Sequence, residues 1–256
     1  MDRSRSEIAS DFIVKRISKN KKPFPVDIWF QPLFDLSRFK CVGGEVLVRG
    51  KYLRETIPPL RFINKLERHG TGIIKLGTHL VDEAFDYINK YCSGPGSHRI
   101  YNINVSRKEL SYPGYADTLI AQSAHYNIFP AIIILEITGQ DSSLTTPMKN
   151  NLETLLKHGF KIAWGDIYSL DMLQRKYNAW QAEYIKLDRR LIAATCLDET
   201  RNLIHQAHIR DINVIAEGIE TLQQVSFLLK EKVTLGQGYL FSRPVTKEMF
   251  AEHYVE

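Results

Sequence analysis

The sequence predicts a single α/β domain, a TIM-like (β/α)8 barrel preceded by a short N-terminal helix. Eight short runs rich in apolar residues recur along the chain, and from the third run onward they start roughly 25–30 residues apart, the length of one strand–helix unit. The segments between these later runs carry apolar residues at helical spacing. The length of 256 residues is normal for one such barrel.

The N-terminal segment is expected to be separate from the barrel. Residues 1–24 are predicted to form a helical, basic extension, and residues 25–256 to form the barrel domain. An amphipathic helix in the extension would place Ile8, Phe12 and Ile17 on its apolar face. Such a helix could dock on the barrel or lie on a membrane surface, and we expect a docked or frayed terminal helix.

The eight apolar runs are the expected strands, and they begin at Val26, Cys41, Arg99, Ala131, Phe160, Glu183, Ile212 and Gly236. Several runs are almost wholly apolar, as strands covered on both faces should be. Residues 144–159 and 200–211 are two of the expected intervening helices. His205 and His208 lie three residues apart in the second, where a solvated or packed helix face is favoured over a zinc pair. The loop SGPGS at Ser93–Ser97 is too short to separate two domains.

Composition excludes several classes of protein. Hydrophobic residues make up 44% and charged residues 25% of the chain, which argues against disorder. No apolar run reaches about 18 residues, so we expect no membrane span, and no signal peptide is visible. Cys41, Cys92 and Cys196 are far apart and odd in number, which favours reduced thiols and a cytoplasmic location. The net charge of +5 suits an anionic ligand, but no DNA-binding motif is present.

Polar residues follow the apolar runs at the positions where the predicted strands end. In a (β/α)8 barrel these ends meet at one mouth, where active sites lie. The residues are Glu45, Asn104, Glu136, Asp166, Lys186, Asp188, Glu217 and Gln237. A single acid at a strand end is more often a solvated loop residue, but a ring of acids around one barrel predicts a site. Carboxylate and amide oxygens are the hard ligands that Mg²⁺ and Mn²⁺ prefer.

Several motifs resemble one known family. EVLVR at Glu45–Arg49 resembles the Glu-x-Leu-x-Arg signature of the EAL family of cyclic di-GMP phosphodiesterases. The resemblance extends over nearly the whole chain from about Asp27 onward. The other matching segments are FQPLFDL from Phe30, PPLRFINKLERHGTGI from Pro58, NINVSRKEL from Asn102, LEIT from Leu135, YIKLD from Tyr184, IAEGIE from Ile215 and GQGYLFSRP from Gly236.

This resemblance implies an EAL-type barrel that hydrolyses cyclic di-GMP to pGpG with two Mg²⁺ or Mn²⁺ ions. Carried over by position, the metal ligands would be Glu45, Asn104 and Glu136. The catalytic residues would be Glu217 and Lys186, and the substrate site would include Arg49, Gln31, Gln237 and Asp188. Two adjacent cations can activate a water and stabilise both the entering and the leaving oxygen of an in-line displacement. The family also implies a cytoplasmic role in motility, adhesion or biofilm control.

The segment FKIAWGDIYS, from Phe160, departs from the family pattern. There the family carries two aspartates followed by a glycine-rich loop, whereas this chain has Gly165 and Asp166 and no such loop. The first family aspartate binds metal, so Gly165 puts the second metal in doubt. Asp166 is the candidate to replace the missing ligand. Smaller departures include Gly50, where the family commonly has tryptophan.

Two functions from different classes follow from this departure. In the first, the chain is a cyclic di-GMP phosphodiesterase of reduced activity, which is slightly favoured because six other site residues match. In the second, it is a degenerate EAL protein without activity that binds cyclic di-GMP or a protein partner and acts as a regulator. A homodimer is compatible with either function.

Overall fold

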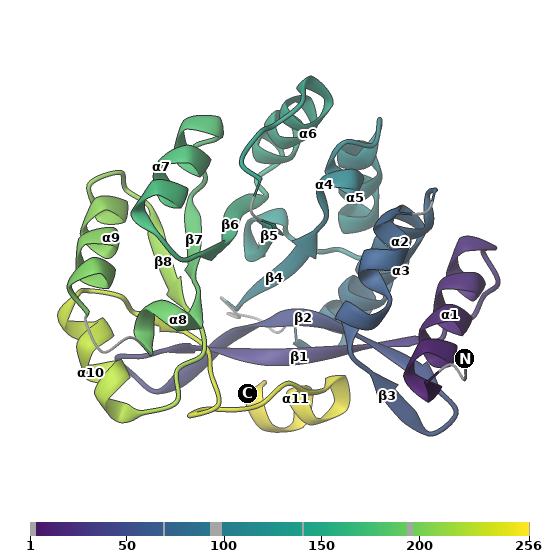
Figure 1. The fold of residues 1–256 in the computed structure, drawn as a ribbon, viewed down its shortest axis with the longest axis horizontal. Helices are drawn as coiled ribbons and strands as arrows, with labels where there is room; N and C mark the ends of the chain where they lie inside the picture. The colour runs from purple at the N-terminus through teal and green to yellow at the C-terminus, as the bar shows by residue number, and fades with distance from the viewer. Residues whose placement is uncertain (1–3, 69, 93–98, 140, 194–196, 256) are drawn as a thin grey trace.

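The computed structural model describes residues 4–68, 70–92, 99–139, 141–193 and 197–255, and it shows a closed barrel surrounded by helices (Figure 1). Going round the barrel, the strands are β1 (Val26–Asp35), β2 (Lys40–Tyr52), β4 (Ile100–Val105), β5 (Ile133–Ile137), β6 (Lys161–Ile167), β7 (Tyr184–Leu187), β8 (Asn213–Ala216) and β9 (Leu235–Gly236), and β9 pairs with β1 to close it. The expected barrel of eight strands is therefore confirmed.

The first strand differs from a regular (β/α)8 repeat. β1 runs antiparallel to both of its barrel neighbours, β2 and β9, whereas the pairs from β2 to β9 are parallel. Only residues 36–39 join β1 to β2. A parallel connection needs about a dozen residues or more, so this short turn permits only a hairpin. Apolar periodicity carries no information on strand direction, so the sequence pattern did not indicate that the first strand is reversed.

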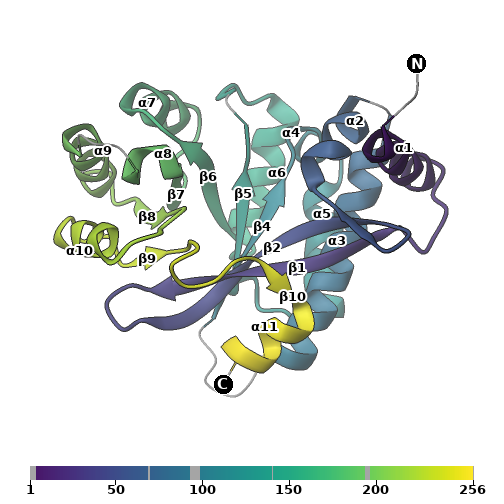
Figure 2. The same ribbon diagram turned by 60° about the horizontal axis from the view of Figure 1, so that its bottom comes forward.

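The helices cover the outside of the barrel (Figures 1 and 2). The longer ones are α3 (Gly72–Tyr87), α5 (Tyr115–His125), α6 (Thr146–Lys157), α7 (Leu170–Ala179), α9 (Asp198–His208), α10 (Leu222–Lys230) and α11 (Lys247–Tyr254). Shorter elements are β3 (Glu55–Ile57), η1 (Pro59–Arg61), α2 (Ile63–Arg68), the π-helix η2 (Ile88–Cys92), α4 (Arg107–Leu110), η3 (Pro130–Ile132), α8 (Arg189–Ile192) and β10 (Val245–Thr246). The SGPGS loop lies outside the described residues.

The N-terminal helix α1 (Arg5–Ser18) is docked beside α2 and α3 (Figure 2). It buries Ala9, Ile13 and Ile17, which follow each other at four-residue spacing. Ile8 and Phe12, expected on the packed face, are 46% and 42% exposed. The helix therefore packs through a different face from the expected one, and this face contains Ile13. Ile13 lies against Gly50, where a Cβ would be only 2.6 Å from Ile13 Cδ1. The missing side chain at position 50 thus leaves the space that Ile13 fills.

The interior of the barrel is filled by one apolar layer beneath the mouth. Its buried members come one from each of five strands, namely Leu33, Ile134, Ala163, Tyr184 and Ile215. Because strand side chains alternate between faces, the residue two positions further along each strand also points inward. This alternation fixes which residues form the next layer, at the mouth.

Candidate active site

The layer above the apolar core carries the charged residues. Two positions beyond Ile134, Tyr184 and Ile215 stand Glu136, Lys186 and Glu217, one residue from each strand or strand end. On the antiparallel strand β1, Gln31 pairs with Glu45 of β2 at the same level. The period of two therefore brings together at one level side chains that are far apart in the sequence.

Lys186 is the centre of this layer. Its Nζ lies 2.8 Å from Glu45 Oε2, 2.7 Å from Glu136 Oε2 and 2.6 Å from Glu217 Oε1, and its side chain has no exposed surface. The ammonium donates hydrogen bonds to Glu45 and Glu136 and forms an ion pair with Glu217. We call Lys186, Glu45, Glu136 and Glu217 the acid ring. Together they carry three negative charges against one positive charge when all are ionised.

The three carboxylates do not have the same affinity for a proton. Burial would raise the pKa of Glu45, but Lys186, Gln237 and Asn104 all donate to it, and its net pKa is lowered. Burial raises the pKa of Glu136 to about 8 against the attraction of Lys186, its hydrogen-bond donor in the ring. Burial also raises the pKa of Glu217. The carboxylates keep the pKa of Lys186 well above its usual value despite its own burial, so Lys186 stays charged.

Two amides extend the acid ring. Asn104 Nδ2 donates to Glu45 Oε1 at 2.8 Å, and Gln237 Nε2 donates to Glu45 Oε2 at 2.6 Å and to Glu217 Oε1 at 3.3 Å. Oε1 of Gln237 is buried and has no hydrogen-bond partner among the described residues. A buried amide oxygen without a donor costs free energy unless a water or a cation meets it.

The residues present fit one hard divalent cation. Glu45, Asn104 and Glu136 come from three adjacent strands and offer carboxylate and amide oxygens, the donors that Mg²⁺, Mn²⁺ and Ca²⁺ prefer. Gln237, whose amide oxygen has no partner among the described residues, donates its Nε2 hydrogen to Glu45. Among the residues that the structure describes, no cluster of three or more Asp, Glu, His or Cys has metal-binding geometry as it stands. The Lys186 ammonium contacts Glu45, Glu136 and Glu217 in their present positions.

The end of β6 is built differently. Gly165 is the inward position of this strand, two residues after Ala163, and it is buried in the same layer as Glu136. A Cβ built on Gly165 would lie 2.3 Å from Glu136 Oε1, so the Glu136 carboxylate occupies the space of the missing side chain. The pairing of β6 with β7 is interrupted between Trp164 and Ile167. Asp166 has a φ of 55° in this bulge and is exposed at the mouth.

The predicted substrate residues have different surroundings. Asp188 is the N-cap of α8, and its carboxylate accepts from the backbone N–H and the guanidinium of Arg190. Arg49 donates to its neighbour's carbonyl oxygen and lies 5.5 Å from the Trp29 ring centroid. Gln31 lines the mouth together with Asp188.

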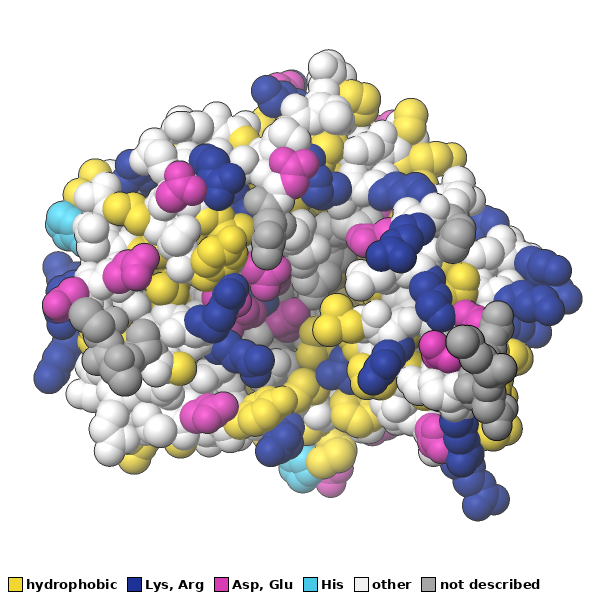
Figure 3. Space-filling view, viewed as in Figure 1, with side chains coloured by type: hydrophobic (Ala, Val, Ile, Leu, Met, Phe, Trp, Pro, Cys, Tyr) yellow, Lys and Arg dark blue, Asp and Glu magenta, His cyan; other side chains and the backbone are white. Residues whose placement is uncertain are grey.

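Two connected hollows open around the acid ring, and acidic side chains lie in the central depression of this face, with Lys and Arg around it (Figure 3). One hollow, of about 310 Å³, lies over the ends of β6, β7 and β8 and includes Gln31, Glu217 and Tyr239. The other, of about 730 Å³, runs between β2, α2, α3 and α4 and is mainly apolar. Both include Glu45 and Asp166, so the acid ring lies where they meet.

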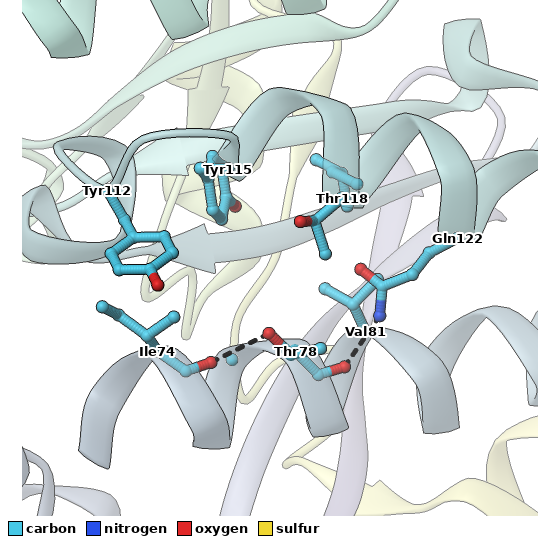
Figure 4. Close-up of a pocket in the computed structure, with 9 residues that line it drawn as sticks. Ile74, Thr78, Val81, Tyr112, Tyr115, Thr118 and Gln122 are labelled. Carbon is cyan, nitrogen blue, oxygen red and sulfur yellow. Dashed lines mark hydrogen bonds between the residues drawn. The ribbon is translucent and has the colours of Figure 1, made fainter. Parts of the chain in front are cut away.

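A third cavity is small and lies outside the barrel, between α3 and α5 (Figure 4). Its volume is about 80 Å³. Its polar groups bond within the helices: Thr78 Oγ1 donates to the Ile74 carbonyl, and Gln122 Nε2 donates to the Thr78 carbonyl. With its hydrogen bonds satisfied in this way, the cavity is a packing gap between helices.

Sequence reasoning missed two buried charged residues near the site. Lys176 of α7 has no exposed surface, and its Nζ donates to the Gly165 carbonyl at 2.7 Å. Glu109 of α4 is 5% exposed and accepts from the Ser106 backbone N–H at 2.9 Å. Helical spacing could have found Lys176, because it lies on the same face as the buried Met172 and Leu173.

Other expectations concern side chains away from the mouth. Neither Cys41 nor Cys92 forms a disulfide with another described residue, and Cys196 lies outside the described residues. His205 and His208 belong to α9, where no metal cluster involves them among the residues that the structure describes. Among the described helices, none combines the length and the apolar character needed to cross a bilayer.

The fold and the site define a class of protein: a TIM-like barrel whose strand ends direct carboxylates, amides and a buried lysine into one mouth. The chain belongs to the EAL domain family, whose model matches residues 19–244. Cyclic di-GMP phosphodiesterase PdeL of Escherichia coli K12 is 26% identical over 236 residues, which cover 89% of this chain and 64% of PdeL. The chain thus spans less than two thirds of the length of that relative.

Solved structures agree with this assignment of the fold. The EAL enzyme Bd1971, in a form with cAMP and cyclic di-GMP bound, superposes with a TM-score of 0.82 at 22% identity over 96% of this chain and 68% of that chain. BlrP1 of Klebsiella pneumoniae, in a complex with manganese and cyclic di-GMP, has a TM-score of 0.71 at 20% identity over 88% of this chain and 57% of that chain.

Proposed function

We propose that the chain is a metal-dependent phosphodiesterase that hydrolyses cyclic di-GMP to linear pGpG. The observation that carries this proposal is the acid ring, in which Lys186 contacts Glu45, Glu136 and Glu217 at 2.6–2.8 Å at the mouth. Support also comes from PdeL, a cyclic di-GMP phosphodiesterase of the same family, and from the cyclic di-GMP bound in Bd1971 and BlrP1. A role in biofilm or motility control would follow from that substrate.

The residues that would hold the cation are Glu45, Asn104 and Glu136, with Asp166 as a further candidate ligand at the mouth. Mg²⁺ or Mn²⁺ fits these oxygen donors, and manganese is present in the BlrP1 complex. When bound, the cation supplies Lewis-acid polarisation of the phosphate and of the attacking water. A second cation has fewer donors because Gly165 offers no side chain.

The chain's own residues would bind and orient the reactants. In the hydrolysis, the water oxygen bonds to phosphorus, one ester oxygen leaves, and a water proton goes to the leaving oxygen. Glu217, at the edge of the acid ring with 22% of its side chain exposed, is placed to accept a hydrogen bond from that water. Lys186 holds Glu217 and contributes positive charge against the developing negative charge on the phosphate. Arg49, Gln31, Gln237 and Asp188 would contact the substrate.

Incubation of the purified chain with cyclic di-GMP and Mn²⁺ or Mg²⁺ tests this function, with chromatographic detection of pGpG. The proposal expects product with either ion, loss of product in EDTA, and at least about a 100-fold loss in Glu217→Gln. The matched control is Glu153→Gln, an exposed carboxylate of α6. Absence of pGpG over a titration of both ions would reject the enzyme.

The bulge at Gly165 favours a second candidate function, an EAL protein without catalysis that binds cyclic di-GMP or a protein partner as a regulator. Calorimetry and the pGpG assay, both carried out with Mn²⁺ or Mg²⁺ present, separate the two functions, since the regulator binds cyclic di-GMP but forms no pGpG with either ion. A chain that neither hydrolyses nor binds the nucleotide would act through a protein partner. Sedimentation of the same preparation reports whether the chain forms a homodimer.

A further inference from the structure

We propose that Lys176 is a positioning residue of the active site: its buried ammonium fixes the bulge at the end of β6 and thereby holds Asp166 at the mouth. The inference concerns the same site as the proposed function and rests on it for its catalytic consequence. Nothing in the family signature or in the acid ring involves Lys176, which lies in α7, on the outer side of the barrel wall.

The geometry begins with the broken ladder. β6 and β7 pair in register at Ala163 and Trp164, and pairing resumes only at Ile167. The carbonyl of Gly165 lies in this gap, and Lys176 Nζ donates to it at 2.7 Å. A buried carbonyl that lies where the strand pairing is interrupted needs another hydrogen-bond donor, and Lys176 is that donor.

The surroundings of Lys176 hold it in place. Its Nζ lies 5.1 Å from the Trp164 ring centroid, and Trp164 in turn donates its Nε1–H to the Trp180 carbonyl at 3.0 Å. Among the described residues, no carboxylate lies within ion-pair distance of this ammonium. A buried charge without an ion pair is expensive. Burial lowers the pKa of Lys176 to about 8, while attraction to Asp166 and then to Glu136 opposes that shift.

The consequence for the site follows from the next residue. Asp166 adopts a φ of 55°, a conformation that a non-glycine residue keeps only when its surroundings impose it. With the Gly165 carbonyl bound to Lys176, the peptide between Gly165 and Asp166 has one orientation. Asp166 then lies at the mouth, where the two hollows meet. The Lys176 ammonium also places a positive charge on the outer side of β6, the strand whose inward residue is Gly165.

The test compares Lys176→Met, which removes the charge and the donor, with Lys176→Arg, which keeps both. Arg175→Met, on the exposed side of the same helix, is the control for loss of a positive charge. Amide hydrogen exchange of residues 161–168 requires no activity. We expect at least about 10-fold faster exchange in Lys176→Met, less than about 2-fold change in Arg175→Met, and partial recovery in Lys176→Arg. Equal exchange in all three variants would overturn the proposal.

A double-mutant cycle then tests whether Lys176 acts through Asp166, with Mn²⁺ affinity by calorimetry as the readout. Lys176→Met and Asp166→Asn are each expected to weaken Mn²⁺ binding by about 10-fold, and the double variant by no more than either one alone. Additive losses, or a wild-type chain that binds no Mn²⁺, would refute this action through Asp166. Intact Mn²⁺ binding without pGpG formation would reject the phosphodiesterase while leaving the positioning role of Lys176 supported.

Discussion

The ends of β5 and β6 are neighbours in one barrel, and a buried lysine stabilises each of them in a different way. β5 places the Glu136 carboxylate in the mouth layer and relies on Lys186 from inside the barrel to neutralise it. β6 places Gly165 in that layer and Asp166 at the exposed rim of the mouth, and the Gly165 carbonyl is bound by Lys176 from outside the barrel. The comparison teaches that the buried oxygen donors proposed to hold the cation lie on the β2, β4 and β5 side, whereas β6 offers no inward side chain there.

Removal of Lys186 breaks the β5 arrangement and has the largest expected effect. Lys186→Met leaves three buried carboxylates without their cation, so we expect the free energy of unfolding to fall by about 3–5 kcal/mol. Burial raises the pKa of carboxyls left in this way, so the folded state binds their protons more tightly than the unfolded chain does. The loss should therefore be greater at pH 8 than at pH 5. Urea unfolding at the two pH values measures it, and an equal loss at both would contradict this account.

Glu109 shows the behaviour of a buried carboxyl that forms no ion pair with any described residue. Burial raises its pKa from 4.5 to about 7, so the folded state retains the proton, and the stability it contributes is full below pH 4.5 and is lost as the pH rises through 7. Glu109→Gln keeps the acceptor of the Ser106 cap and removes the charge. We expect the unfolding free energy at pH 8 to rise by roughly 2 kcal/mol, with little change at pH 4.5.

Urea unfolding of Glu109→Gln at pH 4.5 and pH 8 checks this expectation, with the exposed Glu153→Gln as the control. A gain of the same size at both pH values would mean that the amide packs better, and it would remove titration of Glu109 as the cause.

Position 165 offers a way to make β6 resemble β5. Gly165→Asp adds an inward carboxylate, for which the Glu136 carboxylate must move aside. We expect Mn²⁺ affinity to rise by about 10-fold and the metal-free protein to become less stable, because a fourth negative charge joins the ring. Gly165→Ala moves Glu136 without adding a ligand and should weaken Mn²⁺ binding. Calorimetry decides between them, and equal affinities in the two variants would contradict the expectation.

The smallest effect is expected at the end of β7. Asp188 caps α8 and pairs with Arg190, so Asp188→Ala should lower the unfolding free energy by about 1 kcal/mol. If the carboxylate also contacts the substrate, the KM for cyclic di-GMP should rise by at least about 10-fold. Thermal unfolding and steady-state kinetics separate the two roles, and an unchanged KM would limit Asp188 to the cap.

The sequence allowed the barrel and its mouth to be predicted because the apolar runs recur at the length of strand–helix units and because strand ends meet at one mouth. The contacts of Lys186 with Glu45, Glu136 and Glu217 agree with that rule. The direction of β1 could not be predicted from apolar periodicity, which is the same for either direction. The role of Lys176 stayed hidden because a lysine in a helix is usually solvated, and only the broken ladder at Gly165 explains its burial.

The reversed first strand has a consequence for how the barrel can be connected to other modules. Val26, where β1 begins, pairs with Gly50 near the mouth end of β2, so the chain enters the barrel on its open side. A parallel first strand would begin at the opposite, closed side. A module fused ahead of α1 would therefore lie near the rim of the mouth, beside α2 and α3. In this barrel the direction of β1 thus decides at which end of the barrel an upstream module would lie.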